Sequence, residues 1–365
     1  MTRVSMKAAF PGKYVQGPGA SADVGRYITQ FGQRGLVLAT QSAFTSCIPA
    51  LRATLPQGTR VEPFNGECSE KELARIGALI REHRIDVVVG IGGGKVIDTA
   101  KITADRNGCR VIVMPTIAST DAPCSGCAIV YTDDGVFESV FYQKNNPDVV
   151  IVDSQIVALA PARFLVSGMG DALSTWFEAR SCQRSQSPNE CGGQGTISSY
   201  ALSELCYKTL MRYGRAAKLA CEQHVVTPAL ERIIEANTLL SGLGFESSGL
   251  AAAHAIHNGL TALHGTHGCF HGEKVAFGTV TGLHLTDADP DEIDAVYAFC
   301  EDVGLPTTFD GIGLSGVSRD DLMRVAERSC DAKESIHKEA GCMTPGRVLD
   351  ALIAADAFGR ARRNA

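Results

Sequence analysis

Short apolar runs alternate with amphipathic stretches along the first 155 residues of the chain. Four of these runs are short and aliphatic, a pattern that predicts mostly buried strands. They span residues 36–39, 85–89, 111–114 and 149–152. The stretch between the first two has helical spacing, and Ser69 with Glu72 predicts a capping box at its start. Strands and helices that alternate in this way indicate a mainly parallel sheet with helices on both faces.

The hydrophobic pattern changes after Pro161. Before it, strand-like segments at 128–132 and 136–142 flank an Asp-Asp-Gly turn, which predicts a hairpin. After it, the apolar positions have helical spacing and no strand is expected. We therefore expect an α/β domain over residues 1–160 and an all-helical domain over residues 161–365, with a ligand-binding cleft between them.

A run of glycines separates the strand predicted at 85–89 from the helix that follows. Gly92, Gly93, Gly94 and Lys95 form this turn. Glycines let backbone N–H groups approach an anion closely, and a helix N-terminus adds partial positive charge, so a phosphate is the expected guest. The stretch matches neither a Walker loop nor a complete Rossmann fingerprint, since Lys95 stands where the third glycine of the fingerprint belongs. A tight turn without a ligand is the alternative.

Composition narrows the class of protein. A chain of 365 residues with 45% hydrophobic residues is long enough for two cores. The net charge is −6 and no basic cluster is present, which argues against nucleic acid or an anionic membrane as the main partner. The N-terminal residues do not resemble a signal peptide, and no segment is apolar enough to span a membrane, so a cytoplasmic location is expected.

The thirteen cysteines are scattered and are expected to be reduced thiols. Cys124 and Cys127 form a CxxC pair, but no second pair exists to complete a structural zinc site. A redox pair usually opens a helix, whereas this one precedes a strand-like segment. We expect neither function from it.

Histidines are concentrated in one region of the chain. Five of the nine fall within eighteen residues, at positions His254, His257, His264, His267 and His271. Neutral imidazoles suit zinc, and a carboxylate is the most plausible third ligand. Solvated or packed histidines are the alternative.

Asp171 is the best candidate for the carboxylate ligand. It follows two glycines in an otherwise apolar setting, LVSGMGDALSTWFEA. We expect it to head a helix, where the alternative role of an Asp is that of an N-cap.

Several longer motifs together resemble the glycerol dehydrogenases of the iron-containing alcohol dehydrogenase superfamily. They are GIGGGKVIDTAK, PTIASTDAPCSG, GMGDALSTWFEAR, EQHVVTPALERIIEANTLLSG and GLAAAHAIHNGLTAL followed by HGEKVAFGT. The similarity extends from about Pro11 to the last helices. It implies a dehydroquinate synthase-like fold, α/β plus all-α, with an N-terminal Rossmann-like nucleotide-binding domain, a C-terminal helical domain and a catalytic zinc.

The resemblance also implies roles for individual residues. Asp171, His254 and His271 are the implied zinc ligands, and Asp121 is implied to hold a substrate hydroxyl. The implied dinucleotide contacts are Gly92, Gly93, Gly94, Lys95, Asp98, Thr116, Ser119, Ser125, Cys127 and Tyr131. The implied reaction oxidises the secondary hydroxyl of glycerol, or of a related 1,2-diol, to the hydroxyketone with NAD. The implied assembly is a homo-oligomer, for which an octamer is plausible.

Two departures from the family pattern bear on the metal and the cofactor. The iron-using branch has a histidine four residues after the aspartate ligand, where this chain has Thr175, and this favours zinc. NAD-using members have an acidic residue after the first strand, where this chain has Thr40 and Gln41. NADP is therefore tolerated, but no arginine stands beside Thr40 to bind a 2′-phosphate, and NAD remains the expected cofactor.

Other functions and roles stay open at this point. An NADP-preferring diol or hydroxyketone reductase, a sugar-phosphate cyclase (a lyase) and a non-catalytic binding protein are the alternatives. The region around His254 lacks the Lys and Arg residues that a phosphorylated substrate needs. His257 is either a partner of a ligand or simply packed. His264 and His267 are expected in a loop, with a metal-binding role of His267 as the alternative. Lys274 has the alternative of a surface ion pair with Glu273.

Overall fold

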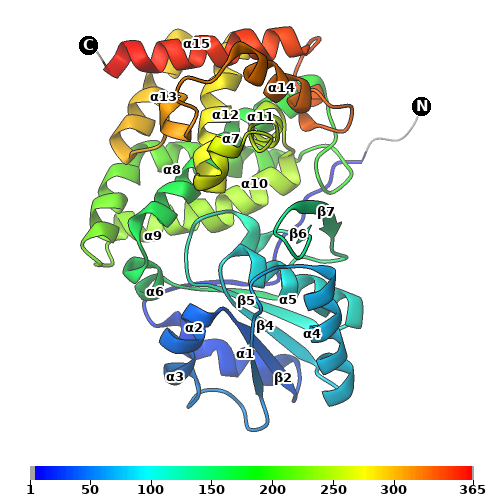
Figure 1. Ribbon diagram of the computed structural model, residues 1–365. Helices are drawn as coiled ribbons and strands as arrows, with labels where there is room; N and C mark the ends of the chain where they lie inside the picture. Colours follow the sequence, from blue (N-terminus) through cyan, green and yellow to red (C-terminus); the bar gives the residue numbers. More distant parts are fainter. Residues whose placement is uncertain (1–4, 364–365) are drawn as a thin grey trace. The chain divides into compact units, whose positions relative to one another are not determined.

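The computed structural model describes residues 5–363, and these residues form two compact units (Figure 1). One unit consists of Ala9–Pro161 and Ala220–Gly242. The other consists of the described parts of Met1–Ala8, Ala162–Leu219 and Leu243–Ala365. The predicted domain ranges, 1–160 and 161–365, stay a prediction; the units differ from them mainly in the return of residues 220–242 to the sheet.

The first unit is built on a six-stranded parallel sheet with the strand order β1-β8-β5-β4-β2-β3. Its strands are β1 (Tyr14–Gly17), β2 (Gly35–Ala39), β3 (Arg60–Pro63), β4 (Val87–Gly92), β5 (Arg110–Pro115) and β8 (Val149–Asp153). The four predicted strands are confirmed as β2, β4, β5 and β8. The two edge strands, β1 and β3, were not predicted, because they are only four residues long and mostly half-buried, so their pattern is weak.

Alternate residues of the central strands face opposite layers of helices. Val87, Val89 and Ile91 of β4 belong to a core with α1 (Val24–Phe31), α2 (Gln41–Ser46) and α3 (Ile48–Leu51). The intervening residues face α5 (Gly94–Asn107), which packs beside α4 (Glu70–His83). A Cβ at Gly90 would lie 2.7 Å from the Cβ of Ala100, so glycine lets α5 approach β4 closely. The predicted parallel sheet with helices on both faces is confirmed.

The predicted hairpin is confirmed, and it explains why the predicted capping box is wrong. β6 (Cys127–Tyr131) and β7 (Phe137–Tyr142) pair antiparallel. Asp133, in the turn between them, accepts a hydrogen bond of 2.6 Å from the Ser69 hydroxyl. Ser69 is the N-cap of α4 but makes no side-chain cap, and Glu72 binds Asn65 and Arg75 instead. A charged acceptor on a neighbouring element replaces the local cap.

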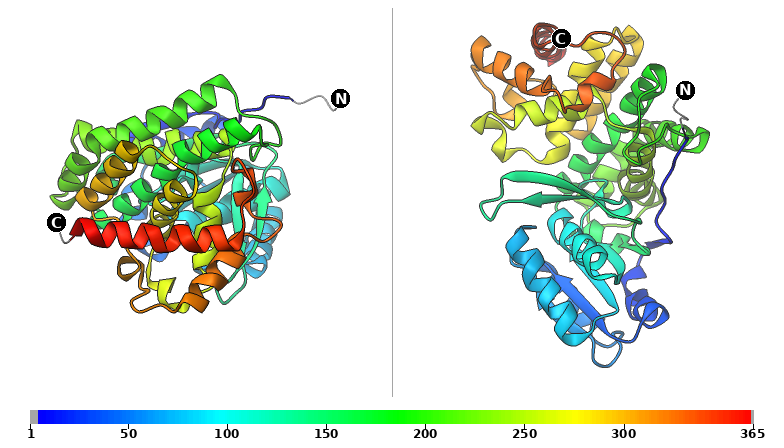
Figure 2. Two further views of the ribbon diagram at one scale, coloured as in Figure 1. Left: turned by 90° about the horizontal axis from the view of Figure 1, so that it is seen from above. Right: turned by 90° about the vertical axis from the view of Figure 1, so that its right-hand side faces the viewer.

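The second unit is helical, as predicted, and no β-strand lies between Pro161 and the end of the described chain. Its longer helices are α7 (Ala162–Ser185), α8 (Ile197–Glu222, which continues into the first unit), α10 (Ser241–Ser248), α11 (Ala252–Leu260), α12 (His271–Leu285), α13 (Pro290–Val303), α14 (Arg319–Ser329) and α15 (Pro345–Arg363). Helix α12 contacts α7, α11 and α15, and α14 contacts α15 as well (Figure 2). Among the described residues no helix combines the length and apolarity needed to cross a membrane.

Two further helices belong to the sheet unit. They are α6 (Ser154–Leu159), which follows β8, and α9 (Pro228–Glu235), which packs on α6 and β1. Glu231 of α9 accepts hydrogen bonds from Gln16 of β1 and Ser154 of α6. These contacts give a physical reason why residues 220–242 group with the sheet.

Candidate metal centre and dinucleotide site

Helices α7 and α12 approach each other so closely that only glycine fits between them. A Cβ at Gly272 would lie 1.8 Å from the carbonyl oxygen of Ser167, and one at Gly170 would lie 2.3 Å from that of Gly272. Asp171 directly follows Gly170, and His271 directly precedes Gly272. The backbone contact therefore brings the two side chains together.

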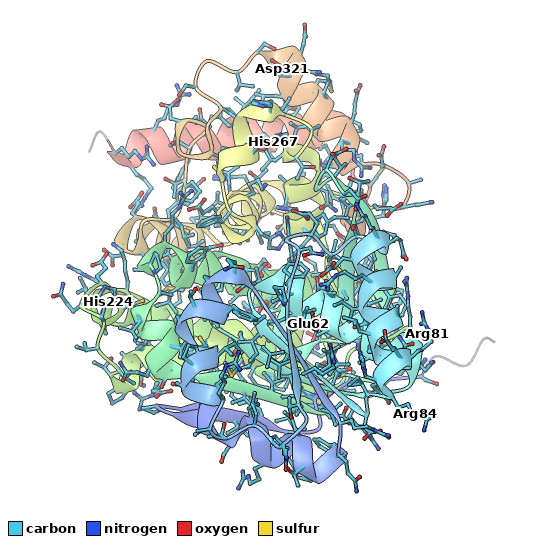
Figure 3. The ribbon with its side chains drawn as sticks, turned by 60° about the horizontal axis from the view of Figure 1, so that its bottom comes forward. Glu62, Arg81, Arg84, His224, His267 and Asp321 are labelled. Atoms are coloured by element: carbon cyan, nitrogen blue, oxygen red, sulfur yellow. The ribbon has the colours of Figure 1, made fainter. Side chains whose placement is uncertain are left out.

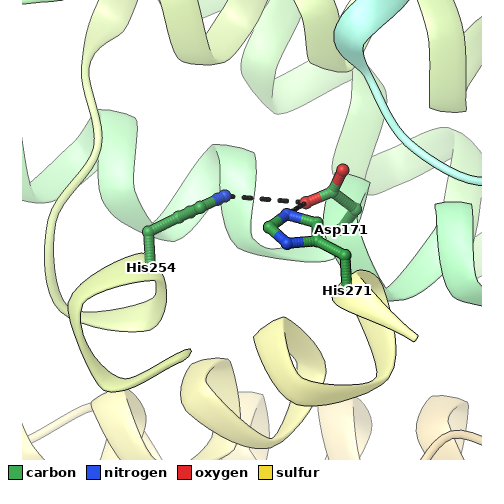
Figure 4. Close-up of side chains that lie close together, drawn as sticks. All are labelled: Asp171, His254 and His271. Carbon is green, nitrogen blue, oxygen red and sulfur yellow. Dashed lines mark ion pairs between the residues drawn. The ribbon is translucent and has the colours of Figure 1, made fainter. Parts of the chain in front are cut away.

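Asp171, His254 and His271 form a group of side chains that fits a metal ion (Figure 4). The Oδ1 atom of Asp171 lies 3.0 Å from His271 Nε2 and 3.6 Å from His254 Nε2. One ligand atom from each residue lies within 4.8 Å of the others. Two imidazole nitrogens and one carboxylate oxygen are a common ligand set for a catalytic divalent ion.

Asp171 does not cap a helix, because it lies in the interior of α7, well after Ala162. The expectation that it heads a helix is therefore wrong, and so is its alternative role as an N-cap. Its side chain is 1% exposed. An acidic residue in the middle of a buried helix face requires a cationic partner, and the imidazoles are placed to provide one or to share a metal.

His254 is held from behind by a second buried carboxylate. Its Nδ1 lies 2.7 Å from Glu178 Oε2, and the Glu178 side chain is 2% exposed. The other oxygen, Oε1, accepts hydrogen bonds from the backbone N–H groups of Ala251 (2.8 Å) and His254 (3.0 Å). Glu178 thus fixes both the start of α11 and the orientation of the imidazole.

His271 is backed by a chain of hydrogen-bonded side chains. His257 Nε2 lies 3.0 Å from His271 Nδ1, and His257 Nδ1 lies 3.0 Å from the Asn258 Oδ1 atom. Asn258 in turn donates a 2.8 Å hydrogen bond to Glu334. If the Nδ1–H of His271 donates to His257, every following bond has a donor and an acceptor, and His271 Nε2 keeps its lone pair for a metal. His257 is therefore a partner of a candidate ligand.

The charged groups of the cluster shift one another's pKa values strongly, as expected of side chains that lie this close together. Burial by itself raises the pKa of Asp171, but the two imidazoles outweigh it and hold that pKa far below its ordinary value. Burial lowers the pKa of His254, yet Glu178 and Asp171 raise it well above its ordinary value. Burial and the nearby His271 keep the pKa of His257 well below its ordinary range, so that His257 is neutral.

The other residues considered in this region lie outside the cluster. His264 and His267 belong to a short 3₁₀ helix, η4 (His264–Gly268), and the exposed His267 places Nε2 3.2 Å from the carbonyl oxygen of Thr261 (Figure 3). Lys274 is only 9% exposed, so a surface ion pair with Glu273 is wrong. Glu273 instead pairs with Arg163, at 2.6 Å, and caps the N–H of Phe270.

The glycine turn has the geometry of an anion site. Gly92 has φ 145°, and a Cβ there would lie 2.5 Å from the side chain of Thr40, so the position requires glycine. Gly93 is the N-cap of α5, and a Cβ at Gly94 would meet nothing within 4 Å. Open space at the N-terminus of a fourteen-residue helix fits a pyrophosphate. Lys95 at this turn pairs with Glu67, and its Nζ lies 5.2 Å from the centre of the Tyr131 ring.

Five further predicted dinucleotide residues lie on β6 and on the loop after β5. Cys127 and Tyr131 belong to β6, whereas Thr116, Ser119 and Ser125 lie between β5 and β6. Ser125 is fully buried, and its hydroxyl faces the carbonyl oxygens of Ala122 and Cys127.

Asp98, on α5, supports β6 from inside the unit. It is 5% exposed, accepts a 3.0 Å hydrogen bond from the N–H of Ile129 and lies 3.6 Å from the Nζ of Lys101. The fully buried Lys101 also donates to the carbonyl oxygens of Ala122 and Cys127. These contacts give Asp98 a structural role, and its contact with a dinucleotide stays a prediction.

Asp121 is held by the segment that returns to the sheet unit. Its side chain accepts a 2.8 Å hydrogen bond from the Ser241 hydroxyl. Ser241 follows η3 (Ala236–Leu240), a π-helical turn that contacts the short 3₁₀ helix after Asp121. Single π-helical turns often occur at functional sites, and this one places a donor beside the carboxylate.

Comparisons with known proteins identify the family of this chain. The family described as iron-containing alcohol dehydrogenase matches residues 11–154. The glycerol dehydrogenase of Thermotoga maritima is 53% identical over 97% of this chain and 98% of its own length. The glycolaldehyde reductase of Halobacterium salinarum is 44% identical over 97% of this chain and 98% of its own length.

The chain belongs to the iron-containing alcohol dehydrogenase family. A solved structure of a probable glycerol dehydrogenase from Sinorhizobium meliloti is similar, with a TM-score of 0.92 and 46% identity over 98% of this chain and 99% of that one. The predicted resemblance to glycerol dehydrogenases and the fold class are confirmed. The sequence did not predict the roles of Glu178, which contacts His254, and of Ser241, which contacts Asp121. Glu178 lies seven residues, or two helical turns, after Asp171, and this spacing was an available signal.

Proposed function

We propose that this protein is an NAD-dependent dehydrogenase that oxidises the secondary hydroxyl of glycerol, or of a related 1,2-diol, to the hydroxyketone. For glycerol the product is dihydroxyacetone. The observation that carries the proposal is the buried cluster of Asp171, His254 and His271, in a chain closely similar to named glycerol dehydrogenases.

Each part of the reaction has residues that suit it. The oxidation removes a hydride from the carbon, which NAD accepts, and a proton from the hydroxyl oxygen, which is released to solvent. Asp171, His254 and His271 would hold the metal, which when bound acts as a Lewis acid that favours ionisation of the hydroxyl. Asp121, oriented by Ser241, would accept a hydrogen bond from the neighbouring hydroxyl and so favour diols over simple alcohols.

We propose zinc as the metal. Two imidazoles and a carboxylate suit zinc, and the position four residues after Asp171 is Thr175, which offers no fourth protein ligand of the kind that iron-using members have. The hydroxyl of Thr175 is buried on the same helix. A site with three protein ligands leaves a position open for the substrate.

We propose NAD as the cofactor, which accepts the hydride. The turn at residues 92–95 would bind its pyrophosphate, together with the residues predicted on β6 and the preceding loop. Thr40 caps α2 by accepting from the N–H of Ala43, at the position where an acidic residue would bind the adenosine ribose. Without that carboxylate NADP is tolerated, and an NADP-preferring reductase of hydroxyketones is the alternative. The assembly is proposed to be a homo-oligomer in the cytoplasm.

One relative gives a specific reason to test a second substrate. The similar protein of Halobacterium salinarum is named a glycolaldehyde reductase, at 44% identity. The assay therefore needs glycerol, other 1,2-diols and a simple secondary alcohol, each with NAD and with NADP. It also needs dihydroxyacetone and glycolaldehyde, each with NADH and with NADPH. We expect the highest kcat/KM for glycerol or another 1,2-diol with NAD. A preference for glycolaldehyde with NADPH would instead support the reductase.

Removal of one ligand tests the metal centre. His271→Ala should abolish both bound zinc and turnover, because two remaining ligands do not hold the ion. The control is His267→Ala, since His267 is exposed and lies outside the cluster. Zinc content is measured on the purified variants, and turnover is followed by the absorbance of NADH. Full activity in zinc-free protein would contradict the proposal.

A further inference from the structure

We propose that Glu178 is a positioning residue for the metal centre: it holds His254 as the tautomer whose Nε2 is free to bind the ion. The inference rests on the metal site of the proposed function. It concerns a residue that lies behind the ligands and that the reaction itself does not use.

The two oxygens of Glu178 have different partners. Oε1 accepts from two backbone N–H groups, those of Ala251 and His254, at 2.8 and 3.0 Å. Oε2 lies 2.7 Å from His254 Nδ1. Because a carboxylate only accepts, Nδ1 must carry a hydrogen. The opposite nitrogen, Nε2, is the one that faces Asp171 at 3.6 Å, and it keeps its lone pair when the ring is neutral.

The burial of Glu178 makes this arrangement rigid. Its side chain is 2% exposed, so water does not compete for the bond to the imidazole. Carboxylates that fix a ligating histidine in this way change metal affinity by about 10- to 100-fold when they are replaced. Support of the α11 N-terminus alone is the competing role, since both backbone donors lie there.

Glu178→Gln separates the two roles. The backbone N–H groups of Ala251 and His254 require an oxygen opposite them, so the glutamine must place its oxygen there. Its NH₂ group then points at His254 Nδ1 and donates to it. This forces Nδ1 to be the acceptor and puts the hydrogen on Nε2, where the metal would bind. The glutamine still supports the N-terminus of α11, but His254 now has the tautomer that cannot bind the metal through Nε2.

Glu339 provides a matched control. It is also a buried glutamate, at 6% exposure, and its Oε1 accepts a 3.1 Å hydrogen bond from the N–H of Ala252, the first residue of α11. Glu339→Gln therefore alters a second buried carboxylate at the same helix end. If support of α11 were the only role of Glu178, the two substitutions would have similar effects.

The experiment measures how tightly the full-length protein retains zinc in buffers of graded zinc and chelator. We expect Glu178→Gln to weaken zinc binding about 10- to 100-fold and Glu339→Gln to weaken it less than about twofold. Equal affinity of Glu178→Gln and wild type, or equal losses in both variants, would overturn the inference. If wild type itself binds no zinc, the proposed function fails before this inference is tested.

A second pair of variants decides the question if a glutamine variant does not fold. Glu178→Asp keeps the negative charge, but the shorter side chain moves the carboxylate away from His254 Nδ1. Glu339→Asp shortens a buried glutamate that does not contact His254. We expect a clear loss of zinc affinity in the first and little change in the second. The reverse order would contradict the role of Glu178.

Discussion

Ser241 is the residue that orients Asp121, the carboxylate proposed to bind a substrate hydroxyl. Its hydroxyl donates a 2.8 Å hydrogen bond to Oδ2 of Asp121, and both side chains are buried. A hydrogen bond to a charged group contributes about 1.5–3 kcal/mol. The serine therefore limits the orientations in which Asp121 would meet a substrate hydroxyl.

Ser241→Ala should lower kcat/KM for glycerol about tenfold, which corresponds to about 1.4 kcal/mol. A simple secondary alcohol has no neighbouring hydroxyl for Asp121, so its kcat/KM should change little. Steady-state kinetics with both substrates measure the difference. Ser185→Ala, at the end of α7, where the hydroxyl bonds to Ser181 and Ser187, serves as the control. A loss of equal size for both substrates would show that Asp121 does not select diols.

At the scale of elements, the crossing of α7 and α12 determines whether the candidate metal ligands Asp171 and His271 meet. Gly272→Ala would place a Cβ 1.8 Å from the Ser167 carbonyl oxygen, so the helices must move apart. Overpacking of this kind typically costs about 1–3 kcal/mol. We expect a lower melting temperature and a weaker zinc site, because Asp171 and His271 flank this contact.

Gly346→Ala is the matched control for this substitution. Gly346 also lies in a helix, near the start of α15, and a Cβ there would meet nothing within 4 Å. The melting temperature and zinc content of the Gly346→Ala variant should equal those of wild type or exceed them slightly. Retention of normal zinc affinity by Gly272→Ala would mean that the ligands do not depend on the helix contact. Differential scanning calorimetry and metal analysis of both variants provide the measurements.

The elements differ in how well the sequence predicted them, for physical reasons. Strands buried on both faces, such as β4, consist of consecutive apolar residues and are recognisable locally. The position of Asp171 inside α7 was missed, because two preceding glycines resemble a helix start unless their contact with α12 is known. The prediction of a side-chain cap at Ser69 is wrong because a residue distant in sequence competes with the local backbone. Asp133, sixty-four residues away, accepts the hydrogen bond of the Ser69 hydroxyl. Long-range contacts decided both cases.

At the scale of the whole molecule, the candidate ligands and the candidate dinucleotide residues belong to different compact units. Asp171, His254 and His271 all lie in the helical unit, and the glycine turn lies in the sheet unit. The chain crosses from one unit to the other more than once, because residues 220–242 return to the sheet. The change of pattern near Pro161 predicted the two kinds of structure, but it contained no information about this return.

This division predicts where zinc and NAD stabilise the protein. A ligand that binds only the folded site adds RT ln(1 + [L]/Kd) to the free energy of opening that site, about 2.7 kcal/mol at 100 times Kd. Removal of zinc should therefore speed amide hydrogen exchange in α11, in the middle of α7 and at the start of α12. The segments β4 and α5 should change little on zinc removal, and NAD should protect the turn between them. Hydrogen exchange with mass spectrometry of the zinc-loaded, zinc-free and NAD-bound protein measures these effects. Equal acceleration in both units on zinc removal would mean that the ion stabilises the chain through global unfolding rather than through three helices of one unit.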